Sequence, residues 1–264
     1  MCELGGALYV SGGYNGTDKL SSVERYTPSS DTWSAIGAMP SSRCEHCACA
    51  VGGSMYVLGG RVDLLTTVSV LRYDNNADAW SEVAPMPERR MELAACVVGT
   101  DVYVFGGQND DGEATNTVFR YDTASDEWST LAPMPEAREG CQACALGGMV
   151  YVVGGRGENW SRLSSVFRFD PASGLWSTVA PMSTARRYFG LFVLGGCMYA
   201  AGGMGTEQSA EKYDPGTDSW SDVSPMLGNG RRCFSAQSVT TRAEIVEEDL
   251  FDMLIAKAAA RRQG

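Results

Sequence analysis

The sequence is poor in histidine and in positive charge. It contains one histidine, His46, and its 21 lysine and arginine residues are outnumbered by 32 aspartate and glutamate residues, which leaves a formal net charge of -11. The field around a protein with this charge repels phosphate polyanions. We therefore expect no nucleic-acid partner.

The sequence also lacks a recognisable targeting or membrane segment. Residues 1–10 contain no basic stretch followed by a long apolar run, so they do not predict a secretory signal. The uncharged stretch from Tyr188 to Thr206 contains six glycines, and we reject it as a transmembrane helix. Nine cysteines are an odd number, which favours reduced thiols over a full disulfide framework. Together these features predict a cytoplasmic protein without a membrane partner.

Glycine, in contrast, is abundant, and it marks an internal repeat. The 31 glycines include five Gly-Gly pairs that follow short apolar runs at intervals of 47, 47, 48 and 48 residues. These pairs are Gly12-Gly13, Gly59-Gly60, Gly106-Gly107, Gly154-Gly155 and Gly202-Gly203. Five of the six tryptophans recur beside them, and each is followed six residues later by a methionine; they are Trp33, Trp80, Trp128, Trp176 and Trp220. The chain thus consists largely of five copies of one unit.

Each unit has the pattern of four short β-strands. An arginine is followed by an apolar strand, a two-residue turn such as Gly52-Gly53, and a second strand that ends at the Gly-Gly pair. A polar loop leads to a third strand ending in a sequence such as Arg72-Tyr73-Asp74, and the tryptophan of the fourth strand comes six residues after that aspartate. Four hairpin-linked strands in a unit of this length are typical of one blade of a β-propeller.

The Gly-Gly pair, the Tyr-Asp pair and the spaced tryptophan resemble the kelch repeat over about residues 1–239. The resemblance implies an all-β, kelch-type β-propeller in residues 1–241, with five blades of four antiparallel strands. The repeat units cover about residues 1–40, 41–87, 88–135, 136–183 and 184–227.

The two ends of the repeat region complement each other. In the complete units an arginine precedes the second glycine of the pair by 17 residues, so the first unit would need one before Met1. We therefore expect the first unit to lack its first strand, and residues 231–239 to close the ring by pairing with the strand around Leu8 to Ser11. This closure resembles the strand exchange of many kelch propellers. Because kelch propellers more often have six or seven blades, an incomplete chain is the alternative. Residues 242–264 predict a short C-terminal helix, acidic early and basic late.

A metal site gains little support from the residues. The group formed by Cys44, Glu45, His46, Cys47 and Cys49 contains suitable zinc ligands. Strand alternation, however, places Cys47 and Cys49 on one face and His46 on the other. We expect the cysteines to be buried as small hydrophobic residues and predict no metal.

Catalysis is supported no better. Enzymes with kelch propellers include copper-radical oxidases and sugar mutarotases, but a single histidine cannot supply the ligands of a copper site. No carboxylate pair stands out for acid-base chemistry, and no serine or cysteine has a histidine partner in a known motif. We predict a protein without catalytic residues or cofactors. An enzyme similar to a sugar mutarotase is the alternative.

Arginine recurs at the start of the units, ten or eleven residues after each tryptophan; these residues are Arg43, Arg90, Arg138, Arg186 and Arg231. In the kelch substrate-recognition propellers that the chain resembles, arginines at this place and the loop after Gly-Gly line one face that grips acidic peptide motifs. An arginine in every blade can equally serve the scaffold, by bonding turn carbonyls or stacking on an aromatic ring. Residues that do not repeat, such as Trp160, lack that explanation. The candidate partner-binding residues are Arg43, Arg61, Arg90, Arg138, Arg156, Trp160, Arg187, Arg232, Tyr14 and Gln108.

These observations predict a non-catalytic protein-interaction module. Rigid blades would display loops and arginines on one face, where a protein or an acidic peptide motif binds at a low ordering cost. The resemblance implies substrate recognition for a cullin-type ubiquitin ligase, with a BTB or cullin component as partner. An actin-associated scaffold is equally consistent with the residues.

Overall fold

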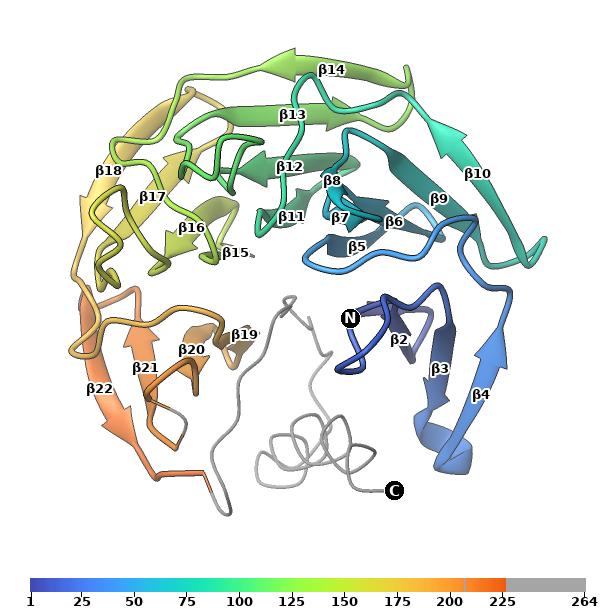
Figure 1. Ribbon diagram of the computed structural model, residues 1–264. Coiled ribbons are helices and arrows are strands. Elements are labelled where there is room, and N and C mark those ends of the chain that lie inside the picture. The colour runs from blue at the N-terminus through green and yellow to red at the C-terminus, as the bar shows by residue number, and fades with distance from the viewer. Residues whose placement is uncertain (207, 227–264) are drawn as a thin grey trace.

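The computed structural model describes residues 1–206 and 208–226, and their regular structure is almost entirely β-strand. A single short helical turn, Pro28–Ser30, interrupts the described strands. Twenty of the 22 strands form five antiparallel sheets of four strands each. Figure 1 shows these sheets in sequence order around a common centre, with β4, β10, β14, β18 and β22 on the outside. The predicted all-β propeller with five four-stranded blades is confirmed.

The blades have closely matched strands. Blade 1 contains β1 (Cys2–Leu4), β2 (Ala7–Ser11), β3 (Val23–Thr27) and β4 (Thr32–Ile36). Blade 2 contains β5 (Cys47–Val51), β6 (Ser54–Leu58), β9 (Val70–Asp74) and β10 (Ala79–Val83). Blade 3 contains β11 (Ala94–Val98), β12 (Asp101–Phe105), β13 (Val118–Asp122) and β14 (Glu127–Thr130). Blade 4 contains β15 (Gln142–Leu146), β16 (Met149–Val153), β17 (Val166–Asp170) and β18 (Leu175–Val179). Blade 5 contains β19 (Gly190–Leu194), β20 (Cys197–Ala201), β21 (Ala210–Asp214) and β22 (Ser219–Val223), and a small hairpin, β7 (Arg61–Val62) with β8 (Leu65–Thr66), extends from blade 2.

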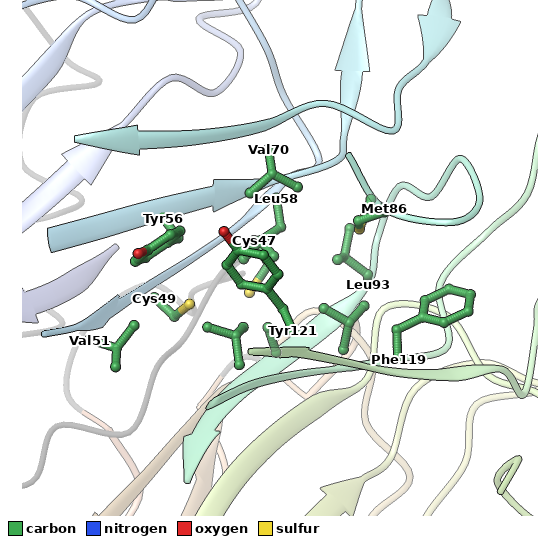
Figure 2. Close-up of a cluster of buried hydrophobic side chains, with 13 residues drawn as sticks. Cys47, Cys49, Val51, Tyr56, Leu58, Val70, Met86, Leu93, Phe119 and Tyr121 are labelled. Carbon is green, nitrogen blue, oxygen red and sulfur yellow. The ribbon is translucent and has the colours of Figure 1, made fainter. Parts of the chain in front are cut away.

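The blades pack against one another through separate hydrophobic cores. Four buried clusters lie at the four junctions between consecutive blades, and each combines side chains of both neighbours. Figure 2 shows the cluster between blades 2 and 3, where Tyr56 of one blade lies near Tyr121 of the next, while Cys49 and Phe119 lie toward opposite ends of the cluster. The stability of such an array comes mainly from contacts between neighbouring units, as in other repeat proteins.

Tryptophans hold the outer parts of the blades together. In four blades the indole N–H donates to a main-chain oxygen of the preceding blade: Trp80 to Gly37 (2.7 Å), Trp128 to Ala84 (2.8 Å), Trp176 to Ala132 (3.0 Å) and Trp220 to Ala180 (2.9 Å). A tyrosine and the aspartate five residues after it add a second contact, the Tyr-Asp contact. The Tyr121 hydroxyl donates to Asp126 Oδ1 (2.6 Å), which also accepts from the backbone N–H of Ala84 (2.8 Å). We call the tryptophan and Tyr-Asp contacts together the junction clasp.

The expectation that the first unit lacks its first strand is wrong. Cys2–Leu4 forms that strand, β1, and pairs with Ala7–Ser11 in the register Cys2 to Tyr9. Glycines Gly5 and Gly6 make the turn with φ of 60° and 80°, as Gly52 and Gly53 do in blade 2 with φ of 59° and 77°. The edge of the strand Ala7–Ser11 that was predicted to pair with residues 231–239 is therefore occupied by β1.

The predicted closing strand 231–239, Arg232 and the predicted helix in 242–264 lie outside the described residues. Within the described part of the chain, the innermost strands are in extended contact in the order β1, β5, β11, β15 and β19. Tyr188 to Thr206, the uncharged stretch, forms the hairpin of β19 and β20 rather than a helix. No helix in the described ranges has the length and apolar character required to cross a membrane.

Candidate functional site

Two sets of loops meet at one end of the propeller. The lead-in loops connect the fourth strand of one blade to the first strand of the next, and the post-glycine loops follow each Gly-Gly pair. Isolated β-bridges join the two sets at Cys44 to Arg61, Met91 to Gln108 and Glu139 to Arg156. We call this end the loop face; it includes lead-in residues 40–46, 87–93, 135–141 and 183–189 and post-glycine residues 14–19, 61–65, 108–112, 156–161 and 204–206.

The Gly-Gly pairs are needed for the close approach of these loops. Gly106 has a φ of 55°, and a Cβ atom there would lie 2.3 Å from the carbonyl oxygen of Arg138. The next residue, Gly107, donates its backbone N–H to the same oxygen at 2.9 Å. A side chain at Gly106 would separate the two loops, so glycine is required by contact as well as by conformation.

The four repeated arginines that the structure describes stand in lead-in loops of the loop face, but their side chains turn into the blades and are buried. Arg138 is fully buried, and it donates to the carbonyl oxygens of Gly154 (3.0 Å) and Ser165 (3.1 Å) and to the Glu136 carboxylate (2.9 Å). Its guanidinium also stacks 4.5 Å from the centre of the Phe167 ring. These are the turn-carbonyl and aromatic contacts of the scaffold alternative.

Arg43, Arg90 and Arg186 are buried in the same way, with exposures of 1%, 3% and 0%. Burial lowers the pKa of Arg43 to about 10, although the charge of Glu82 opposes this effect. The guanidinium is bonded to Ser41, Gly59 and Ser69. The predicted partner-binding residues Arg43, Arg90 and Arg138 are therefore buried and not displayed; their terminal guanidinium nitrogens bond within the chain, whereas their Nε atoms have no hydrogen-bond partner among the described residues.

A second arginine, Arg187, occupies the centre of a charged network that joins three blades. It donates to Glu92 at 2.6 Å and pairs with Glu139 at 2.8 Å, and it lies against the ring of Tyr188 at 4.0 Å. The Tyr188 hydroxyl also donates to Glu92. Glu139 pairs in addition with Arg156, a predicted site residue.

Sequence reasoning missed Glu45, Glu92, Glu139 and Tyr188. Three of them stand two residues after a repeated arginine and adopt a left-handed backbone, with φ of 58° at Glu45, 54° at Glu92 and 56° at Tyr188. Their lead-in loops are joined by backbone hydrogen bonds from Glu92 N to Glu45 O (2.9 Å) and from Gly140 N to Glu92 O (2.8 Å). Gly140 at the equivalent place was the available signal, because glycine often marks a left-handed position.

These carboxylates change the charge of the predicted arginine surface. Burial raises the pKa of Glu45, and the neighbouring Glu92 raises it further. Burial also raises the pKa of Glu139, although Arg187 and Arg156 oppose that effect. The arginines of the loop face are thus balanced by acidic groups, and they do not form a simple cationic patch.

Exposed apolar side chains gather on the same face. Five large hydrophobic residues are exposed among those that the structure describes: Tyr14, Leu64, Leu65, Trp160 and Leu175. All except Leu175 lie in post-glycine loops. Trp160 is 68% exposed, has a φ of 60°, and is stacked on one side by the Arg156 guanidinium at 3.9 Å from the ring centre.

The other predicted site residues occupy several environments. Gln108 is buried and donates to Glu139 (2.8 Å) and to the carbonyl of Gly112 (2.9 Å), so it supports the loops from within. Tyr14 is exposed, and its hydroxyl donates to the carbonyl of Gly16. Arg61 is half-buried at the start of β7.

A groove of about 570 Å³ opens on the loop face between blades 3 and 4. Its lining includes five carboxylates and two arginines: Glu88, Asp110, Asp111, Glu113, Glu158, Arg89 and Arg90. Arg90 pairs with Glu88, and Arg89 lies 3.5 Å from Asp110. The groove is consequently acidic.

The cysteines and the histidine whose residue types could bind zinc lie in two different places, as strand alternation predicts. Cys47 and Cys49 are buried in the core between blades 2 and 3, whereas His46 Nε2 lies 3.2 Å from the Ser11 hydroxyl of blade 1. The described ranges contain no group of three or more histidine, cysteine, aspartate or glutamate residues arranged to hold a metal ion.

Comparisons with known proteins agree with this architecture. A family profile described as the KLHDC2/KLHL20/DRC7 Kelch-repeats domain matches residues 65–246, and the Kelch motif matches residues 1–40 and 42–87. The chain belongs to the kelch-repeat family. Kelch propellers of this kind are typically protein-interaction modules.

Individual relatives match this kelch chain over short segments. Kelch-like protein 35 of Mus musculus is 48% identical over 42 residues, which are 16% of this chain and 7% of that protein. Kelch-like protein 21 of Rattus norvegicus is 51% identical over 41 residues, or 15% of this chain and 7% of that protein. Each match thus spans a small part of the relative's length. Among solved structures, the "Structure of YjhT" superposes with a TM-score of 0.72 at 18% identity over 83% of this chain and 82% of that one, which shows the shared fold.

Proposed function

We propose that this kelch propeller is a non-catalytic protein-interaction module whose partner binds the loop face. The observation that supports this best is the distribution of exposed apolar side chains. Tyr14, Leu64, Leu65 and Trp160 come from three different blades, yet all four lie in post-glycine loops at one end. Exposed tryptophan and tyrosine are frequent anchors of protein interfaces, and loops on a rigid scaffold commonly carry binding residues.

An acidic peptide motif is not retained as the ligand. Arg43, Arg90 and Arg138 are buried, and Arg187 is already paired with Glu92 and Glu139. A partner carboxylate would have to displace these internal carboxylates to gain an arginine, which offsets much of the gain.

Photo-crosslinking tests which face binds. A photoreactive amino acid is placed at position 64, 160 or 175 of the full chain in cells, and the crosslinked proteins are identified. Position 175 is a matched control, because Leu175 is 69% exposed but lies on β18, away from the loop face. We expect the same partner from positions 64 and 160 and not from 175. Crosslinks from 175 alone, or equally from all three positions, would contradict a partner on the loop face.

The identity of the crosslinked partner decides between the finer alternatives. We propose substrate recognition for a cullin-type ubiquitin ligase as the first role to test, because kelch-like proteins are among the matched relatives. A BTB or cullin component, or a protein whose ubiquitination depends on this chain, would support that role. Actin or an actin-binding protein as the partner would instead favour a cytoskeletal scaffold.

A further inference from the structure

We propose that the partner of the loop face presents a lysine- or arginine-rich segment, which lies in the acidic groove between blades 3 and 4 and stacks one cationic side chain on Trp160. This inference rests on the proposed function and names the chemistry of the ligand. It depends on three observations. The indole of Trp160 is exposed, the groove contains carboxylates without a cationic partner in the described residues, and one loop carries both Trp160 and the groove residue Glu158.

The indole of Trp160 is held in a binding-ready position. A left-handed backbone is unfavourable for a bulky residue and persists where surrounding contacts impose it. Here the backbone N–H of Trp160 donates to the carbonyl of Gly157 (3.0 Å), and the Arg156 guanidinium covers one side of the ring. Arg156 is itself fixed by Glu139. Because the side chain remains 68% exposed, the other side of the ring is open to a ligand.

The groove supplies negative charge that the chain does not neutralise. Its two arginines are both close to groove carboxylates, Arg90 to Glu88 and Arg89 to Asp110. Asp111, Glu113 and Glu158 have no cationic partner within residues 1–206 and 208–226. Three unpaired carboxylates around one concavity favour a ligand that carries several positive charges.

One loop connects the indole to the groove. Glu158 lines the groove and stands two residues before Trp160 in the loop 156–161. A cation over the face of tryptophan is attracted by the ring, and nearby carboxylates add a complementary charge. A basic segment in the groove can therefore satisfy the carboxylates and the open face of the indole at once.

The test is a titration with a fluorescently labelled twelve-residue peptide of alternating lysine and serine, followed by fluorescence anisotropy at physiological salt. Peptides of the same length with glutamate in place of lysine, or with acetylated lysines, are the ligand controls. We expect binding of the lysine peptide alone, weakened by added salt as for exposed ion pairs.

The variants separate local binding from general attraction to an acidic protein. The groove variant Asp111→Asn, Glu113→Gln, Glu158→Gln removes three negative charges. The control variant Glu82→Gln, Glu127→Gln, Asp222→Asn removes the same number from exposed positions on the outer strands β10, β14 and β22. We expect the groove variant to bind about tenfold more weakly and the control variant to match the original chain. Trp160→Ala should weaken binding about threefold or more.

Equal weakening by the two triple variants, or no binding of the lysine peptide to the original chain, would overturn the inference. If Trp160→Ala fails to fold, the groove variant still decides, because its substitutions conserve side-chain size at exposed positions. The proposed function is judged separately: crosslinks from positions 64 and 160 without lysine-peptide binding would retain the loop face and remove the basic ligand.

Discussion

The buried ion pair between Arg186 and Glu211 should be far more important for stability than its counterparts in other blades. Both side chains are 0% exposed, and Arg186 donates to Glu211 Oε1 from two nitrogens at 2.9 and 3.2 Å. Glu211 also accepts from the backbone N–H and hydroxyl of Ser183 (2.7 and 2.8 Å) and from the N–H of Thr184 (3.2 Å). The substitution Glu211→Gln keeps the shape but leaves the guanidinium buried without a counter-charge.

The other blades provide a matched comparison. Arg138 is equally buried, but its partner Glu136 is 41% exposed at the side chain, so water can replace the lost charge in Glu136→Gln. Breaking a buried pair from one side costs about 3–5 kcal/mol, whereas an exposed partner contributes about 1 kcal/mol or less. We therefore expect Glu211→Gln to lower the free energy of unfolding by about 3–5 kcal/mol, and Glu136→Gln to lower it by about 1 kcal/mol or less.

Urea-induced unfolding followed by tryptophan fluorescence measures both effects, with Trp220 reporting from the same blade as Glu211. The effect should also depend on pH. Burial alone would raise the pKa of Glu211, but hydrogen bonds from Ser183 and Arg186 outweigh it and the pKa lies below its ordinary value. The stabilising charge is thus present at neutral pH and is lost as the pH falls through the folded-state pKa, so the two proteins should converge in acid. Equal losses for Glu211→Gln and Glu136→Gln at pH 7 would refute the reasoning.

Three further predictions follow from other parts of the fold. Burial, with a contribution from Arg43, lowers the pKa of His46 to about 3. The NMR signal of His46, the single histidine of the sequence, should therefore not titrate between pH 8 and 5. The free energy of unfolding should fall by about 1.4 kcal/mol for each pH unit below about 6.5, because the unfolded chain binds a proton that folded His46 does not. An NMR titration midpoint near about 6.5, the ordinary pKa of histidine, would contradict this. Gly106→Ala should lower the free energy of unfolding by more than about 3 kcal/mol in the same urea assay, because the new Cβ would meet the Arg138 carbonyl. Gly99→Ala is the control: its Cβ would lie in open space, so with a φ of 63° it should cost about 1 kcal/mol. In blade 4, Phe169 and Gly174 stand where blade 3 has Tyr121 and Asp126 of its junction clasp. Phe169→Tyr with Gly174→Asp should therefore stabilise the protein by about 1 kcal/mol, whereas Phe169→Tyr alone should destabilise it. Additive effects in a double-mutant cycle would show that no clasp forms.

The architecture could be read from the sequence because the same residues recur in every unit. A tryptophan, for example, stands at the same place in each copy, and in blade 3 the structure shows this residue, Trp128, bonded to the preceding blade. The missed strand β1 could also have been found: Cys2 precedes Cys49 by 47 residues, and Gly5-Gly6 precedes Gly52-Gly53 by the same interval. The arginine spacing gave no sign of this match, because the position 17 residues before Gly13 lies before Met1.

The candidate site was harder to predict, because strand spacing does not say whether a loop side chain turns inward. The repeated arginine and its neighbour illustrate this limit: Arg186 is enclosed by its own blade, whereas Arg187 joins Glu92 and Glu139 from other blades. Glu92 and Glu139 belong to no recognisable sequence motif. They come together only in the folded protein, where lead-in loops 47 residues apart in the sequence contact each other.

Repetition itself separates scaffold residues from candidate binding residues in this propeller. The four repeated arginines that the structure describes serve the scaffold of their own blades and are buried there; Arg138, for example, bonds the carbonyl oxygen of Gly154. Residues that occur once are free of that demand. Trp160 is the one tryptophan outside the repeat, and it is exposed at 68% while Trp128 is half-buried in a junction clasp. The exposure of Trp160 at a non-repeated position of the loop face therefore supports the proposed interaction. Three of the groove carboxylates, Asp111, Glu113 and Glu158, have no cationic partner in the described part of the chain, and they support the proposed charge of the partner.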